Sequence, residues 1–198
     1  MAGAVDDQWP KKVIEGSTCT QTHLYKHSWE LMMAAYEARF VSQTHPRLPN
    51  LVGWAMADRA VDEQRGLETY VRTITVAGDV PWLVARATGL ETLEIVQTVE
   101  VDRFRRKISM VSKNTTWRDR LQMDEDCSYF ADPDEPAWTG FKQTATLSVS
   151  LGGYGIESTV EGFLISAYSD GIDKVSSYPW HRNPDSLPSD TSAPPVLE

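Results

Sequence analysis

Histidines and acidic runs are the residues of this chain whose types could bind a metal. His23 and His27 stand four residues apart, a spacing that would suit two metal ligands on one helix. The break before Ser28 instead places His23 in a strand and His27 in a turn, so ordinary packing or surface roles compete with a metal site. The acidic runs 124–126 and 132–135 lack the central glycine and distal glutamate of a calcium loop. We therefore expect no metal and no cofactor.

Nucleophilic or phosphate-binding chemistry has no matching motif either. The chain contains no G-x-S-x-G elbow, and no Ser–His–Asp or Cys–His–Asn set is suggested by local context. The glycine-rich run 152–155 lacks the Gly-Lys-Ser/Thr of a phosphate loop, so it predicts a sharp backbone bend. We expect no catalytic residues and no enzymatic activity.

We interpret neither the two cysteines nor the N-glycosylation sequon of this chain as a functional site. Cys19 and Cys127 lie far apart in apparent strands, which favours two reduced thiols over a bridge. The sequon that begins at Asn114 is interpreted as a coincidence, since no signal peptide precedes it.

Two groups of cations could meet an anion. Arg39 follows an apolar helical stripe and precedes Phe40; it either lies in solvent near the negative end of the helix dipole or faces an interior that holds an anionic partner. A dense basic cluster is either a soluble hairpin tip or a contact for anionic lipid headgroups. It consists of Arg103, Arg105, Arg106 and Lys107.

Composition limits the class of protein. The 198 residues are 41% hydrophobic and 24% charged, as in an ordinary globular domain. The net charge of −9 argues against general nucleic-acid binding, which needs a basic face. No apolar run approaches the roughly 20 residues that span a bilayer, and the N-terminus does not have the pattern of a secretory signal.

The elements that would position these residues follow from hydrophobic periodicity. Strict alternation over 139–151 predicts a strand with one buried face, and helical spacing resumes over 155–176. A first helix is predicted from the N-cap Ser28 to Phe40. The other expected strands cover 18–24, 51–61, 66–77, 93–101, 105–116 and 120–130, with a short helix over 82–88. This order predicts an α+β fold, a curved antiparallel sheet of about seven strands with helices on its concave side.

Taken together, these segments resemble the PRELI domain, a phospholipid-transfer family that includes the slowmo and Ups proteins; the segments 25–40 and 138–161 look closest to the PRELI domain of Sec14-like proteins. The resembling segments are His23–Phe40, Val80–Trp82, Val99–Asp102, Asn114-Thr115, Trp138-Thr139 and Ile156–Glu161. Composition predicts a flexible arm at 1–16 and a disordered Pro/Ser/Asp-rich tail at 179–198. The resemblance implies a PRELI-like lipid-binding domain at 17–178 between them.

The family implies a helix-grip, START-like fold that carries an anionic glycerophospholipid, phosphatidic acid or phosphatidylserine, between membranes. By matching positions, Arg39 and Lys174 are expected to bind the headgroup. The expected lid segment is Val80, Pro81, Trp82, Leu83 and Val84. The expected cavity lining is Phe141, Ala145, Leu147, Val149, Val160 and Leu164. The alternative is an interaction module of the same fold without transfer activity.

The resemblance also implies partners and a location. Besides phospholipid, these are a transiently contacted membrane surface and a small helical partner protein with a twin-cysteine motif. The expected location is the mitochondrial intermembrane space, with the cytoplasm as the alternative.

Overall fold

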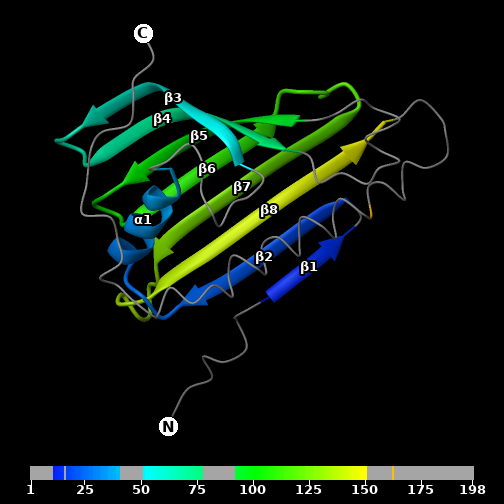
Figure 1. Ribbon diagram of the computed structural model, residues 1–198. Coiled ribbons are helices and arrows are strands. Elements are labelled where there is room, and N and C mark those ends of the chain that lie inside the picture. The colour runs from blue at the N-terminus through cyan, green and yellow to red at the C-terminus, as the bar shows by residue number, and fades with distance from the viewer. Residues whose placement is uncertain (1–10, 16, 41–50, 78–91, 151–161, 163–198) are drawn as a thin grey trace.

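A curved antiparallel sheet with a helix on its concave face forms the framework of the molecule (Figure 1). The computed structural model describes residues 11–15, 17–40, 51–77, 92–150 and 162. The strands are β1 (Lys11–Glu15), β2 (Thr18–Tyr25), β3 (Leu51–Asp62), β4 (Leu67–Ala77), β5 (Thr92–Asp102), β6 (Lys107–Asn114), β7 (Leu121–Ala131) and β8 (Thr139–Val149). Helix α1 (Trp29–Glu37) continues into the 3-10 turn η1 (Ala38–Phe40). The expected α+β class is confirmed, with eight strands in the described residues where about seven were expected.

The strand order separates the two strands that flank helix α1 in the chain. The order is β1-β2-β8-β7-β6-β5-β4-β3, and every neighbouring pair is antiparallel. Strands β2 and β3 are consecutive in the chain but lie near opposite edges of the sheet. The described part of the connection between them contains α1, which lies over one face of the sheet (Figure 1).

Strand β1 extends the sheet beyond the expected start of the domain. Residues 11–15 belong to the segment expected to be a flexible arm, yet they pair antiparallel with β2 from Lys11↔Thr22 to Glu15↔Thr18. Edge strands are stabilised by backbone hydrogen bonds that hydrophobic periodicity does not reveal.

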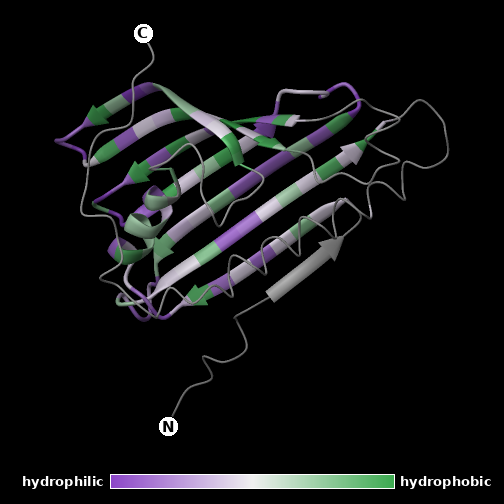
Figure 2. Cartoon of the chain, viewed as in Figure 1, coloured by the Kyte–Doolittle hydropathy of each residue, from purple (hydrophilic) through white to green (hydrophobic). Residues whose placement is uncertain are grey.

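Strand β8 confirms the alternation seen in the sequence. Phe141, Ala145 and Leu147 are buried, whereas Lys142 and Thr146 on the opposite face are exposed. Figure 2 shows hydrophobic and hydrophilic residues interleaved along the central strands. The sheet thus has one buried and one wet face, as expected.

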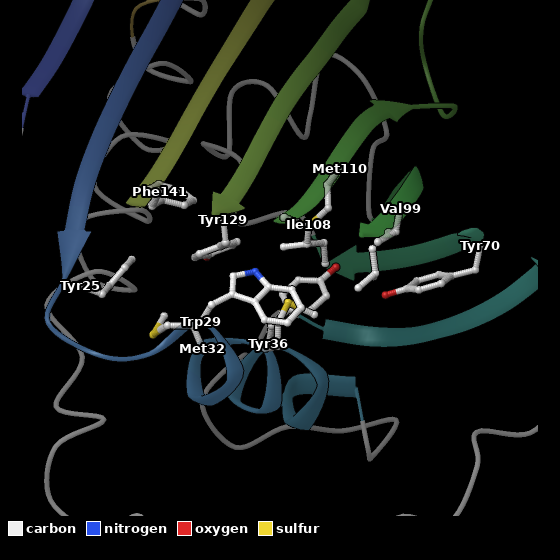
Figure 3. Packing of buried hydrophobic residues seen from close by; sticks show 12 residues of the cluster. Tyr25, Trp29, Met32, Tyr36, Tyr70, Val99, Ile108, Met110, Tyr129 and Phe141 are labelled. Atoms are coloured by element: carbon white, nitrogen blue, oxygen red, sulfur yellow. The ribbon is translucent and has the colours of Figure 1, made fainter. Parts of the chain in front are cut away.

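Helix α1 begins and packs as its sequence predicts. The Ser28 side chain accepts a hydrogen bond from the Leu31 backbone N–H at 3.3 Å, the expected N-cap. Trp29, Met33 and Tyr36 are buried on the sheet side of the helix. They join the main apolar cluster shown in Figure 3. The other buried members of this cluster are Tyr25, Met32, Tyr70, Val99, Val101, Ile108, Met110, Tyr129 and Phe141.

Candidate functional site

A buried arginine on the concave face is the most unusual group of the described residues. Arg72 lies on β4 and is only 2% exposed. Strand alternation places it on the same face as Tyr70, against η1 and the C-terminal end of α1. A guanidinium stays charged at every physiological pH, so its burial costs several kcal/mol unless other groups compensate.

Neutral hydrogen-bond acceptors surround the terminal nitrogens of Arg72. Nη1 donates to the Tyr36 hydroxyl at 2.8 Å and, more weakly, to Gln97 Oε1 at 3.4 Å. Nη2 donates to the Tyr70 hydroxyl at 3.3 Å. The Tyr36 hydroxyl in turn donates to Gln97 Oε1 at 2.9 Å. These contacts fix the position of the guanidinium without a direct carboxylate contact among the described residues; the Glu37 carboxylate interacts with it only through space.

Aromatic rings supply the remaining stabilisation of this cation. The Arg72 Cζ lies 3.5 Å from the centroid of the Phe40 ring, a close stacking contact. The rings of Tyr36, Tyr70 and Trp54 have centroids 5.4, 5.2 and 5.9 Å away. The ring faces attract the positive charge without neutralising it.

Arg72 has no carboxylate partner among the described residues. Its Nε is buried without an acceptor there, and none of the ion pairs between described residues includes it. The indole Nε1 of Trp29 is a second buried donor without an acceptor in the described part of the chain. The orphaned Nε of Arg72 points to an acceptor outside the described residues that completes its site. An anion is the group that matches a buried cation.

Burial also shifts the pKa values of the neighbouring acids. The pKa of Tyr70 is raised chiefly by burial, so its phenol stays protonated near neutral pH. The pKa of the Glu37 carboxyl is also raised chiefly by burial, and nearby Arg103 partly opposes this. The charge of Arg72 opposes both shifts, which places both groups within electrostatic range of its guanidinium.

A polar row extends from Arg72 across the sheet. Arg72, Gln97, Ser112 and Glu125 occupy matching register positions on β4, β5, β6 and β7. Gln97 Nε2 donates to Ser112 Oγ at 3.1 Å, and Ser112 is buried. Beyond Glu125, Gln143 Nε2 of β8 donates to its Oε1 at 2.6 Å. The row therefore runs through the interior of the concave face over five neighbouring strands.

The polar row separates two apolar regions. The main cluster under α1 includes Tyr129 and Phe141. A smaller cluster beyond the row contains Cys19, Met123 and Leu147, with Ile95 packed against it. A face with apolar surface on both sides of a fixed cation can accommodate an amphipathic molecule, with its charged group at Arg72.

The structure describes the side chains of some of the site residues predicted from the sequence but not of others. Arg39 lies in η1, immediately before the Phe40 that stacks on Arg72, and its side chain lies outside the described residues. On β8, Phe141, Ala145 and Leu147 are buried and Val149 is half-buried, on the face that carries the polar row. The remaining predicted positions lie outside the described residues: 80–84, Val160, Leu164 and Lys174.

The histidines and cysteines of the described part of the chain have packing roles. His23 is half-buried on β2 with its ring 4.4 Å from that of Tyr25, and burial lowers its pKa. The His27 backbone carbonyl accepts a hydrogen bond from the Thr139 hydroxyl at 2.8 Å. Cys19 is buried and Cys127 half-buried, and no disulfide joins them, as expected. No cluster of three or more His, Cys, Asp or Glu suited to a metal ion occurs in the described ranges.

Asn114 closes the β6–β7 turn from inside, which gives its sequon a structural explanation. The side chain is 1% exposed and its Nδ2 donates to the Thr116 and Leu121 carbonyls at 2.8 and 2.6 Å. Its Oδ1 accepts from the Met123 N–H at 2.8 Å. A side chain this deeply bonded is inaccessible to glycosylation in the folded protein.

Sequence reasoning missed Arg72 because β4 has no clean alternation. Glu68, Tyr70 and Arg72 share the buried face, whereas Val71 lies on the other. Hydropathy alone would place Val71 inside and Arg72 in solvent. The pairing of β4 with β5, which sets Tyr70 opposite the buried Val99, identifies the interior face, and this pairing is not encoded in the local pattern.

Among the described residues no helix is long and apolar enough to cross a membrane.

A model of the PRELI-like family matches residues 30–177. The chain is 32% identical over 151 residues to Protein real-time of Aedes aegypti, a match that covers 76% of this chain and 23% of that protein. It is 28% identical over 150 residues to the slowmo homologue of Dictyostelium discoideum, which covers 75% and 63% of the two chains.

The chain spans less than a quarter of several curated relatives that it matches. One is the CRAL-TRIO domain-containing protein T23G5.2 of Caenorhabditis elegans, 31% identical over 154 residues that cover 76% of this chain and 21% of that one. Among solved structures, a START superfamily protein from Mycobacterium smegmatis superposes with a TM-score of 0.42 at 12% identity, over 80% of this chain and 96% of the other. The family model matches about three quarters of the sequence, which shows that this chain belongs to the PRELI-like family.

Proposed function

We propose that this protein binds a phospholipid on the concave side of its sheet and transfers it between membranes. The proposed cargo is an anionic glycerophospholipid, phosphatidic acid or phosphatidylserine, with its phosphate at Arg72. The observation that carries the proposal is a buried guanidinium whose partners among the described residues are phenols, an amide and aromatic rings. A phosphate is the ligand that such a guanidinium binds most strongly, through charge-assisted hydrogen bonds.

The apolar clusters on both sides of the polar row support the same cargo. Each acyl methylene removed from water contributes about 0.8 kcal/mol, so a carrier needs extended apolar surface beside the phosphate site. The clusters around Phe141 and Leu147 supply apolar side chains on one face. Family membership agrees with lipid binding, and the proposal requires no covalent step, so we assign no enzymatic activity.

One observation favours the alternative, an interaction module of the same fold without transfer. Arg72 already contacts Tyr36, Tyr70, Gln97 and Phe40. An arginine with this many protein contacts can have a purely structural role and stabilise the fold. In that case removal of the charge would change stability and leave lipid content unaffected.

The cellular setting is proposed from the family alone. We propose the mitochondrial intermembrane space, with the cytoplasm as the alternative, and a small twin-cysteine-motif helical protein as a stabilising partner. Fractionation of cells that express the tagged chain, with partner identification by affinity purification from each fraction, tests both.

The Arg72→Met variant tests the phosphate site. Methionine preserves much of the side-chain volume and removes the charge, so the fold should persist while extraction of fluorescent phosphatidic acid from vesicles falls at least about tenfold. Arg120→Met is the matched control, because Arg120 is half-exposed and lies against Trp117. The Arg39→Glu variant is expected to abolish transfer as well, with the fold intact.

Native mass spectrometry of the purified chain gives the second measurement. Wild-type protein should retain a phospholipid, and Arg72→Lys, which keeps the charge without the planar fork, should retain less. Extraction of phosphatidic acid by Arg72→Met at the wild-type level would reject the phosphate site and favour the interaction module.

A further inference from the structure

The tips of the β3–β4 and β5–β6 hairpins are joined into one surface. The Arg103 backbone N–H donates to the Gly66 carbonyl at 2.8 Å, and β4 pairs with β5 up to Leu67↔Asp102. Gly66 has φ +62°, and a Cβ there would lie only 2.9 Å from the Phe104 ring. Only glycine lets this ring lie so close to the neighbouring tip. We call residues 61–66 and 103–107 the tip surface; besides the basic cluster it exposes Arg65 and the acidic Asp62 and Glu63.

The tip surface exposes apolar side chains that the fold does not use. Phe104 is 71% exposed and Val61 is 56% exposed. One exposed apolar residue is ordinary, but an aromatic ring held on a rigid platform at a hairpin apex suggests a contact. The ring is fixed from below by Gly66 and remains open above.

Cations flank the ring on both sides in the sequence. Arg103, Arg105, Arg106 and Lys107 adjoin Phe104 in a chain whose net charge is −9. The Arg105 side chain is 84% exposed and only 3.6 Å from Asp102, a loose ion pair. Arg103 and Arg106 are held by Glu68 and Glu30, which fix the backbone of the tip. Arg105 and Lys107 are exposed and can contact an external anion.

We propose that the tip surface docks on an anionic bilayer, with Phe104 inserted at the boundary between headgroups and acyl chains. Arg105 and Lys107 would contact lipid phosphates from the rim, as basic residues around an apolar insertion do. A hairpin apex is convex and presents its ring outward. That shape suits entry into a soft lipid interface, and the exposed cations beside the ring match an anionic one.

This docking surface is separate from the phosphate site on the concave face. Phe104 contacts Gly66, whereas the partners of Arg72 are Tyr36, Tyr70 and Gln97. Loss of docking and loss of bound lipid should therefore be separable.

Sedimentation with vesicles tests the docking surface. Vesicles of phosphatidylcholine with phosphatidic acid should pellet the wild-type protein, and Phe104→Ala should weaken this binding about tenfold, as expected from loss of one inserted aromatic side chain. Val111→Ala is the matched control, since Val111 is 45% exposed on β6 away from the tip. Phe104→Leu should restore much of the binding, and thermal unfolding should show each variant folded.

Two further variants in the same sedimentation assay test the role of the surface charge and of the bound lipid. Arg105→Glu should lower binding to the anionic vesicles several-fold, whereas Arg72→Met should pellet as the wild type does even when it has lost its lipid. Wild-type pelleting by Phe104→Ala would overturn the docking surface and would assign the exposed ring to a protein contact instead.

Discussion

Asn114 shows how one side chain can close a turn that the backbone cannot. Its carboxamide bonds two carbonyls and one N–H at the β6–β7 connection, all within a nearly inaccessible site. Asn114→Ala should lower the free energy of unfolding by about 2–3 kcal/mol, because the backbone groups lose their partners inside the protein. Urea unfolding with an unchanged m-value would measure this loss.

The neighbouring Thr115 supplies the control for that prediction. Thr115 is exposed, and its hydroxyl donates to the Glu94 carboxylate at 2.6 Å. Thr115→Val removes a solvent-accessible hydrogen bond and should cost less than about 1 kcal/mol. Equal losses for the two variants would mean that the turn depends on local sequence rather than on the buried carboxamide.

At the residue scale, the sequence led to Arg39 and the structure led to Arg72. Arg39 was identified by its position at the end of an apolar helical stripe and by the family resemblance. Arg72 stands in a strand where Glu68 shares its face, so nothing in its local pattern indicated burial. Its environment is built from Tyr36 and Phe40, which lie more than 30 residues away in the chain. Such contacts arise only when the whole fold is assembled.

At the scale of elements, α1 depends on its first turn. The helix has nine residues, too few to be stable alone, so its cap and its packing must act together. Ser28→Ala should lower stability by about 1 kcal/mol, or about 2–4 °C in the melting temperature of a protein this size. Differential scanning calorimetry measures the shift.

The Ser28→Asp variant distinguishes capping from packing as the role of Ser28. Aspartate keeps an acceptor for the Leu31 N–H and adds a negative charge at the positive end of the helix dipole. Its melting temperature should match or exceed that of the wild type. A drop as large as that of Ser28→Ala would show that Ser28 acts through packing instead of capping.

The elements with local signals were predictable, and their long-range pairing was not. The Ser28 cap, the alternation of β8 and the turn residues before Gly66 each mark a structure within a few residues. The pairing of β2 with β8 joins Thr18 to Thr146, and no short segment encodes it. The edge strand β1 was missed for the same reason, because its place depends on the partner β2.

At the scale of the whole molecule, the phosphate site and the tip surface should act in series. Arg72→Met should remove the cargo, and Phe104→Ala should slow its delivery while the cargo stays bound. The double variant should therefore transfer lipid no worse than Arg72→Met alone. The changes in unfolding free energy should nevertheless add, since the two residues share no partner in the described part of the chain. Fluorescence dequenching in a vesicle-to-vesicle assay and urea unfolding of all four proteins measure the two quantities. A Phe104→Ala protein that had lost its bound lipid would break this separation and place both residues in one site.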